Sequence, residues 1–166
     1  DLREAGSKIT AKDLAQYDAT LSAPLHGQYR GHDIFSAGPL TAGPSLIQAL
    51  KTFEKMHPAP AESPDAAAYL AMAQALQTTY ADRLENLGEG NLSGSTTHIC
   101  TADSEGNLVS FTQTIMSAFG ARILLPNSGI LMNNGMMWFD PRPGGGNSVE
   151  GGRRPLCNMC PTLGRS

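Results

Sequence analysis

The residues best suited to chemistry lie where a loop rich in glycine, serine and asparagine runs into a predicted strand. The loop, residues 86–95, reads NLGEGNLSGS, and Thr96, Thr97 and His98 follow it. A threonine hydroxyl is a weak nucleophile that needs an adjacent base. Cleavage of the Ser95–Thr96 bond would free an α-amino group, with an ordinary pKa of roughly 7.7–8.0, to act as that base. The Thr96 hydroxyl could itself make the cut by attacking the Ser95 carbonyl, although Ser-Thr-Thr also begins ordinary strands.

Three cysteines offer a second chemistry. Cys157-x-x-Cys160 has the spacing of half a zinc site or of a redox pair. No second Cys or His pair follows at zinc-finger spacing, and no βαβ pattern surrounds the motif. We therefore favour small buried or loop residues, with no metal or cofactor. A metal protein using Cys100, Cys157, Cys160 and a histidine stays open as an alternative.

Strand patterns position the threonine. Residues 96–103 and 108–115 alternate in polarity around the turn 104–107, which predicts a β-hairpin. The hairpin folds Thr114 back beside Thr96. Residues 129–132 predict another short strand, and residues 139–152 predict a Pro/Gly-rich loop.

The first half of the chain predicts helices around one strand pair. A capping box at Thr10–Asp13 begins a short helix, and residues 24–35 predict two strands with turns at Gly27 and Gly31. A helix follows from Pro44, then a linker over 56–63. The last helix is predicted to be capped by Ser63 and to turn one apolar stripe to the core. That stripe comprises Tyr69, Met72, Ala73, Leu76, Tyr80 and Leu84.

Composition bounds the class of protein. Of 166 residues, 40% are hydrophobic and 16% charged, with 18 Gly, 11 Pro and a net charge of −3. These values favour a globular, loop-rich α+β chain over a disordered one. With only twelve Lys and Arg, the chain lacks the excess of positive charge that is typical of nucleic-acid binding. No apolar run is long enough for a membrane span. A first residue other than Met leads us to expect a fragment of a longer protein.

Three ordered motifs resemble the γ-glutamyltransferase family. Residues 94–115, GSTTHICTADSEGNLVSFTQTI, resemble its T-T-H-x-S-V-x-D-x-x-G-N-x-V-x-x-T segment. Residues 128–144, SGILMNNGMMWFDPRPG, resemble its G-I-L-L-N-N segment, and residues 152–163, GRRPLCNMCPTL, its G-K-R-P-L-S-S-M-S-P-T segment. Residues 9–50 are similar to the end of its large subunit.

The resemblance implies a fold and a nucleophile. The fold would be part of the four-layer α-β-β-α sandwich of N-terminal-nucleophile hydrolases. Self-cleavage between Ser95 and Thr96 would give a large-subunit-like piece, 1–95, and a small-subunit-like piece, 96–166, which stay associated. Thr96 would be the catalytic nucleophile, and Thr114 would hydrogen-bond its hydroxyl. Thr97 and His98 match positions that look structural.

The substrate positions depart from the family pattern. Candidate substrate-binding residues by position are Asn134, Gly135, Trp138, Cys157 and Asn158. The family's pocket Asn is Met116 here, its Gln and Asp are Gly135 and Trp138, and its Ser-Ser pair is Cys157-Asn158.

A buried ammonium or carboxylate needs a polar partner, so a glutamyl amino group is not expected to bind as in the family. Asn158, Arg153 or Arg154 could still reach a carboxylate, while Met136, Met137 and Trp138 could line an acyl pocket.

These departures resemble divergent branches that include oxamate amidohydrolases and cephalosporin-acylase-like proteins. We expect a self-processing threonine amidohydrolase that acts on a γ-glutamyl-type or other small acyl amide, with hydrolysis favoured over transpeptidation. A catalytically silent or incomplete family member with a binding role is the alternative. The free cysteines slightly favour the cytoplasm, although relatives also occur outside it.

Overall fold

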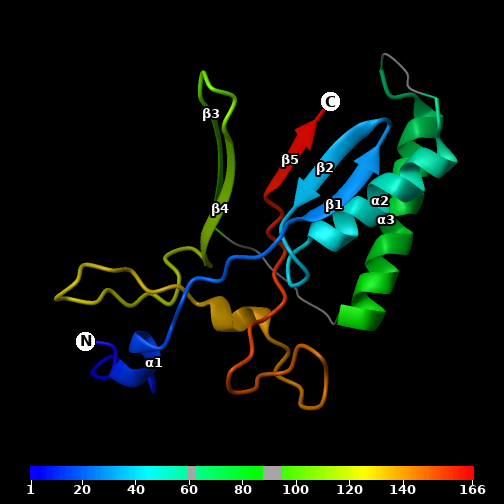
Figure 1. The fold of residues 1–166 in the computed structure, drawn as a ribbon. Coiled ribbons are helices and arrows are strands. Elements are labelled where there is room, and N and C mark those ends of the chain that lie inside the picture. The colour runs from blue at the N-terminus through cyan, green and yellow to red at the C-terminus, as the bar shows by residue number, and fades with distance from the viewer. Residues whose placement is uncertain (60–62, 88–94) are drawn as a thin grey trace.

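The computed structural model describes residues 1–59, 63–87 and 95–166 (Figure 1). Its elements form a three-stranded antiparallel sheet in the order β1-β2-β5, a separate β3-β4 hairpin, and three α-helices. In chain order they are α1 (Ala11–Ala15), β1 (Leu25–Tyr29), β2 (His32–Ser36), α2 (Gly43–Met56), α3 (Ala66–Leu87), β3 (Ser95–Ala102), β4 (Leu108–Met116), the 3-10 helix η1 (Gly135–Trp138) and β5 (Thr162–Arg165).

The first strand pair turns where one of the two predicted glycines lies. Arg30 and Gly31 both have positive φ, 50° and 81°, as a two-residue hairpin turn requires. The predicted turn at Gly27 is wrong, because Gly27 lies inside β1 opposite Ile34. A Cβ at Gly27 would stand 2.6 Å from Cγ2 of Ile47, so this glycine allows α2 to approach the sheet.

The third strand of this sheet was not expected from the sequence. β5 pairs with β2 from Asp33↔Arg165 to Ser36↔Thr162. Four residues are too few for a pattern of alternating polarity to identify a strand. The pairing joins the last residues of the chain to its first quarter.

The helices follow most of their predicted start signals. Thr10 and Asp13 form the capping box of α1, and Pro44 lies in the first turn of α2. The predicted Ser63 cap of α3 is wrong, because α3 begins at Ala66 and the Asp65 carboxylate accepts the Ala68 N–H at 2.7 Å. Asp is as good an N-cap as Ser, and here it lies next to the first helical residue.

The buried face of α3 differs from the predicted apolar stripe. Its buried side chains are Ala68, Ala71, Ala75 and Thr79, whereas Tyr69, Met72, Leu76 and Tyr80 are exposed. α2 contacts β1 on one side and α3 on the other, so α3 packs on a helix rather than on the sheet. Small side chains let the two helices lie close together, which hydrophobicity alone does not reveal.

The β3-β4 hairpin forms as predicted and extends away from the three-stranded sheet (Figure 1). One link between them is the Thr162 N–H, which donates to Oγ of Ser110 at 3.0 Å. Residues 129–132 form a single bridge, Leu124↔Leu131, instead of the expected strand. Residues 139–152 form an irregular loop, as predicted.

The fold is therefore mixed α+β, with two helices stacked on one face of a small sheet. Among the described residues, no large side chain is fully buried, and many apolar ones remain on the surface. No helix in the described part of the chain has the length and apolar character needed to cross a membrane.

Candidate active site

Thr96 and Thr114 lie opposite each other on the hairpin. They are paired in the β3-β4 register, and the Thr96 hydroxyl donates to Oγ1 of Thr114 at 3.1 Å. Oγ1 of Thr114 also accepts the Met116 N–H at 2.9 Å, which holds that oxygen as an acceptor. The predicted pair is thus in contact, with the lone pairs of an exposed Thr96 oxygen available for attack.

The strand end next to this pair has an irregular backbone. The register shifts between Ser95 and Thr96, so that Ser95 pairs with Met116 while Thr96 pairs with Thr114. Met116 has a φ of 74° and is 3% exposed, a conformation that side-chain-bearing residues adopt at a cost. The irregularity lies at the peptide bond predicted to be cleaved.

Asn134, the residue before η1, is hydrogen-bonded to the C-terminal end of β4. Its Oδ1 accepts the Ser117 N–H at 3.0 Å, its Nδ2 donates to Oγ of Ser117 at 2.8 Å, and its backbone N–H donates to the Ile115 carbonyl at 3.3 Å. Asn134 therefore lies beside the threonine pair, with its side chain already bonded within the chain. A contact with substrate stays a prediction.

Gly135 and Trp138 form the short helix that follows. The Gly135 N–H donates to Oδ1 of Asn133 at 2.8 Å, and a Cβ at Gly135 would lie 3.7 Å from the Trp138 ring. The indole Nε1 of Trp138 is buried and has no hydrogen-bond partner among the described residues. Buried indole N–H groups usually have partners, so this donor is an exception in the described part of the chain.

A buried asparagine joins η1 to the third motif. Nδ2 of Asn147 donates to the Trp138 carbonyl at 2.7 Å, and its Oδ1 accepts the Leu156 N–H at 2.9 Å. Asn147 is 5% exposed. It therefore sets the distance between Trp138 and the Cys157-Asn158 segment, a role that the sequence analysis missed.

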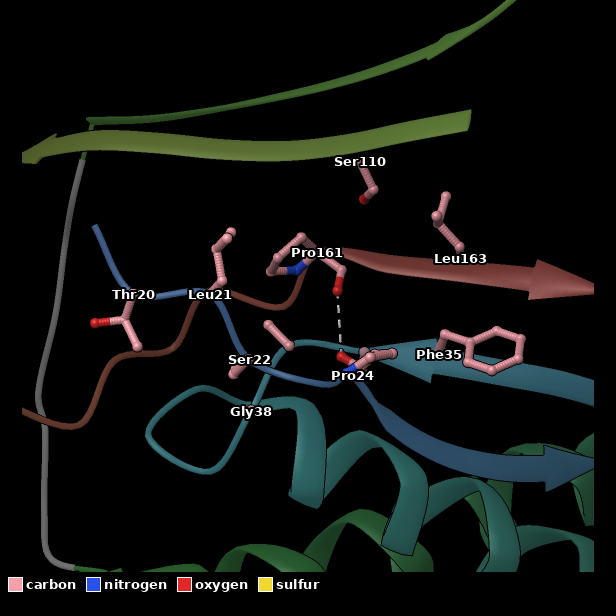
Figure 2. A pocket seen from close by; sticks show the side chains of 11 residues that line it. Thr20, Leu21, Ser22, Pro24, Phe35, Gly38, Ser110, Pro161 and Leu163 are labelled. Carbon is pink, nitrogen blue, oxygen red and sulfur yellow. Dashed lines mark hydrogen bonds between the residues drawn. The ribbon is translucent and has the colours of Figure 1, made fainter. Parts of the chain in front are cut away.

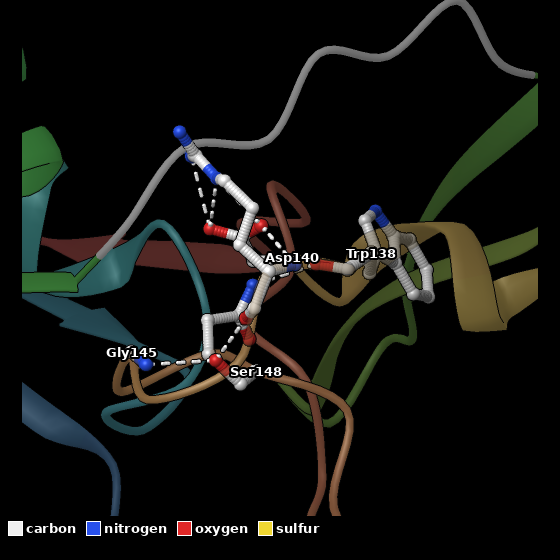
Figure 3. A network of polar contacts seen from close by, with 6 residues as sticks. Trp138, Asp140, Gly145 and Ser148 are labelled. Atoms are coloured by element: carbon white, nitrogen blue, oxygen red, sulfur yellow. Dashed lines mark hydrogen bonds and ion pairs between the residues drawn. The ribbon is translucent and has the colours of Figure 1, made fainter.

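The 139–152 loop around Asn147 is held by its own polar contacts (Figure 3). Oγ of Ser148 donates to the Arg142 carbonyl at 2.5 Å and accepts the Gly145 N–H at 2.8 Å. Arg142 binds the Asp140 carboxylate through Nε and Nη2, which lowers the pKa of Asp140. The loop is thus a fixed support for Trp138.

Cys157 and Asn158 lie on the helical side of the molecule. The Cys157 N–H donates to the Leu40 carbonyl at 2.8 Å, and its carbonyl accepts Nη2 of Arg83 at 3.0 Å. Asn158 lines a cavity of about 300 Å³ between α2 and α3, together with Arg83 and Thr79. Asn134, Gly135 and Trp138 thus lie at η1, which contacts the end of β4, whereas the Cys157-Asn158 segment lies against the helices.

The two sulfurs of the Cys-x-x-Cys motif have different surroundings. Burial raises the pKa of the Cys157 thiol, whereas Sγ of Cys160 lies 3.5 Å from the hydroxyls of Ser36 and Thr162. All three cysteines are free thiols. In the described parts of the chain, no three His, Cys, Asp or Glu side chains are grouped to hold a metal.

The two arginines considered for a carboxylate are engaged elsewhere. Nε of Arg153 pairs with Glu150 at 2.6 Å, and Arg154 donates to the Asp18 carbonyl at 3.4 Å. The guanidinium of Arg154 also lies 5.4 Å from the Tyr17 ring centre.

His98 and Cys100 lie on the hairpin face of Thr96, with Thr112 of β4 opposite His98. His98 bonds Oγ1 of Thr112 through Nδ1 at 2.7 Å, and Sγ of Cys100 lies 3.3 Å from its Nε2. Every second residue of a strand shares one face, which explains why Thr96, His98 and Cys100 lie together.

Comparisons with known proteins agree with these motifs. The family model described as Gamma-glutamyltranspeptidase matches residues 1–94 and residues 89–164. A glutathione hydrolase proenzyme from Escherichia coli (strain K12) is 31% identical, over 98% of this chain and 37% of its own length. The acylase ACY 1 proenzyme of Pseudomonas sp. (strain SE83) is 31% identical, over 95% and 35%.

The chain therefore spans little more than a third of these relatives. A cephalosporin acylase from Bacillus halodurans has the same arrangement, with a TM-score of 0.73 and 25% identity over 99% of this chain and 36% of that one. The match to the family model extends along nearly the whole sequence and includes the hairpin that carries Thr96 and Thr114. The chain belongs to the gamma-glutamyltranspeptidase family.

Proposed function

We propose that this chain carries the nucleophile of a self-processing threonine amidohydrolase. The observation that carries the proposal is the 3.1 Å hydrogen bond from the Thr96 hydroxyl to Thr114, in a chain of this family. A nucleophile held by a fixed acceptor, on a strand that begins at the bond to be cut, is the arrangement that this chemistry needs. The proenzyme relatives support a processed chain.

Self-cleavage would proceed in two steps. The Thr96 hydroxyl oxygen attacks the Ser95 carbonyl carbon, the C–N bond breaks, and the Thr96 nitrogen takes up a proton. The product is an ester between Ser95 and the Thr96 side chain. Water then hydrolyses that ester, which leaves a Ser95 carboxylate and a free Thr96 α-amino group.

The freed amino group completes the catalytic residue. It takes the proton of the Thr96 hydroxyl as that oxygen attacks an amide substrate, and it returns the proton to the departing amine. The acyl group stays on Thr96 as an ester until water removes it. Thr114 orients the Thr96 hydroxyl before the attack, and the hydroxyl turns its proton from Thr114 to the amino group as the reaction begins.

The substrate class follows from the polarity around η1. Met116, Gly135 and Trp138 supply no charged partner for a glutamyl ammonium, whose burial without one would cost several kcal/mol or more. We therefore assign a small acyl amide without an α-amino group, in line with the similarity to acylases.

The two products of cleavage would stay together. β5 is paired with β2 across the cut, and the Cys157 N–H and the Ala42 N–H donate across it to Leu40 and Met159. The exposed apolar side chains of α3 and of the hairpin fit the inner layers of a four-layer sandwich, which the rest of a longer polypeptide would complete.

An amide-hydrolysis assay tests the proposal. The chain is incubated with a panel of N-acyl amides and a γ-glutamyl amide. Thr96→Ala is assayed beside it, with Thr97→Ala as the matched control, since Thr97 is the next residue of β3 and pairs with Gln113 instead of Thr114. We expect release of amine from small acyl amides by the chain and by the control only. Equal rates for the chain and Thr96→Ala would contradict the proposal.

The same assay decides the alternative of a silent family member. The described residues leave large apolar faces uncovered, and the chain spans about a third of its relatives. Cleaved chain that shows no amide hydrolysis with any substrate would favour a role in binding over catalysis.

A further inference from the structure

A buried hydroxyl without a partner lines the cavity between α2 and α3, the α2–α3 cavity. Thr79 is 2% exposed, and its Oγ1 is buried with no hydrogen-bond partner in the described part of the chain. The hydroxyl of the neighbouring Thr78 instead donates to the Gln74 carbonyl at 3.0 Å, a common bond for a helical threonine. Because a buried polar group without a partner costs free energy, the Thr79 hydroxyl is suited to bond a molecule in this cavity.

A cation without a carboxylate partner lines the same cavity one helical turn further along α3. Nη1 of Arg83 donates to the Thr41 carbonyl at 3.2 Å and to Oγ of Ser45 at 3.3 Å, and Nη2 donates to the Cys157 carbonyl at 3.0 Å. All three acceptors are uncharged, and no ion pair of Arg83 is found among the described residues. A guanidinium has more N–H donors than these bonds use, so Arg83 retains donors and an unbalanced charge for an anion.

The rest of the cavity lining is mostly apolar. Leu46 and Ala49 line it from α2, and Leu76 and Tyr80 line it from α3. An apolar lining with a few polar groups is the usual composition of a small-molecule site, and the cavity volume of about 300 Å³ suits a small ligand. The lining therefore fits a molecule with a short apolar body and one anionic head group.

We propose that the α2–α3 cavity binds a small monocarboxylate with a short aliphatic body. The carboxylate accepts hydrogen bonds from the Arg83 guanidinium and the Thr79 hydroxyl, while the aliphatic body lies against Leu46 and Leu76. One negative charge matches the single charged side chain in the described lining. Both polar partners belong to α3, outside the three motifs that resemble the family.

A larger groove lined by β2 and β5 provides a comparison (Figure 2). Its volume is about 500 Å³, and its described lining contains no charged side chain. The buried hydroxyl there already has a partner, because Oγ of Ser36 donates to the Pro161 carbonyl at 3.2 Å. A carboxylate is therefore expected to bind in the α2–α3 cavity and not in this groove.

Isothermal titration calorimetry with hexanoate tests the proposal. The unaltered chain is compared with Thr79→Val and with the matched control Thr78→Val, an exposed neighbour outside the cavity lining. We expect saturable binding that Thr79→Val weakens by about two- to tenfold, as the loss of one hydrogen bond does. Thr78→Val should bind as the unaltered chain does. Thr79→Val removes an unpaired hydroxyl, so its urea midpoint should be equal or higher, which separates lost affinity from lost folding.

Two further ligands test the head group. Hexanamide keeps the body without the charge, and hexylammonium reverses the charge. Both should bind more weakly than hexanoate to the unaltered chain. Arg83→Gln should weaken hexanoate binding by about tenfold or more, as loss of a hydrogen bond to a charged group does, and should remove the preference over hexanamide. If Arg83→Gln does not fold, the comparison of Thr79→Val with Thr78→Val still decides.

The result is independent of the proposed amidohydrolase, because Thr96→Ala should bind hexanoate with the affinity of the unaltered chain. Absence of saturable hexanoate binding up to roughly 10 mM, where millimolar affinity would be seen, would overturn the proposal. Equal hexanoate affinity in Thr79→Val, equal affinity for hexanamide or hexylammonium, or loss of hexanoate binding in Thr96→Ala would overturn it as well.

Discussion

The hydroxyl oxygen of Thr114 accepts two hydrogen bonds, and its removal should slow self-cleavage. The Thr96 hydroxyl and the Met116 N–H both donate to Oγ1 of Thr114. Thr114→Val keeps the shape of the side chain and removes its hydroxyl oxygen, whereas Thr114→Ser keeps the hydroxyl and removes the methyl group. We expect Thr114→Val to slow self-cleavage roughly two- to tenfold, the rate equivalent of the about 0.5–1.5 kcal/mol of one hydrogen bond. The measurement is a time course of chain cleavage, and equal slowing in Thr114→Ser would show that bulk rather than the hydroxyl matters.

Asn147 is the buried residue whose loss should affect stability most directly. Its side chain bonds the Trp138 carbonyl and the Leu156 N–H, and truncation leaves both backbone groups unpaired. We expect Asn147→Ala to lower the free energy of unfolding by about 1–3 kcal/mol in urea titrations. Asn127→Ala serves as control, because its side chain is exposed and bonds only the Asp1 carboxylate among the hydrogen bonds found in the described residues, and it should change the free energy of unfolding by less than about 0.5 kcal/mol.

At the scale of elements, the α2–α3 contact depends on alanines. Ala75 is 1% exposed, whereas Ala73, two residues away, is exposed. Ala75→Leu should overpack the helix contact and lower stability by about 1–3 kcal/mol, while Ala73→Leu should leave it nearly unchanged. Thermal or urea unfolding of the two variants is the measurement. A larger loss of stability in Ala73→Leu than in Ala75→Leu would instead support the buried face predicted from the sequence, which includes Ala73.

The three-stranded sheet should lose stability in acid through one carboxylate. Hydrogen bonds from His26 and then from Arg165 lower the pKa of Asp33 to about 2. An ordinary Asp titrates near ~3.9, so this contribution is complete above that pH and is lost as the pH falls towards 2. Urea unfolding between pH 5 and 2 should therefore show a steeper loss for the chain than for Asp33→Asn. Parallel curves would rule out a role for this carboxylate.

The sequence predicted the elements with strong local signals. The hairpin around residues 104–107, the capping box at Thr10 and the turn at Gly31 were all confirmed, because each depends on neighbouring residues. Three features were missed, namely β5, the Asp65 cap and the inward alanine face of α3. β5 needs a partner 126 or more residues away, and the alanine face reflects how closely two helices pack.

The candidate site, like the fold, has some features that the sequence predicted and others that it did not. The resemblance to the family pointed to Thr96 and Thr114, and the register of the predicted hairpin explains why they meet. It did not indicate that Asn134 would be bonded to Ser117, or that Asn158 would line a cavity between helices. Those placements depend on how the 117–161 loops fold, and loops carry little periodic signal.

At the scale of the whole molecule, contacts already join the two predicted pieces across the expected cut. β5 pairs with β2, and Arg83 of α3 binds the Cys157 carbonyl. Cleavage at one bond removes none of these contacts. We therefore propose that the chain cuts itself before Thr96 and that the two pieces remain one folded body.

Intact mass spectrometry after prolonged incubation, with size exclusion before denaturation, tests this central claim most directly. The account predicts pieces 1–95 and 96–166, a new N-terminal Thr96, co-elution of both pieces before denaturation, and no cleavage of Thr96→Ala. Thr97→Ala, the matched control, should still be cut. An uncut chain, or a Thr96→Ala variant cut at the same bond and rate, would contradict it.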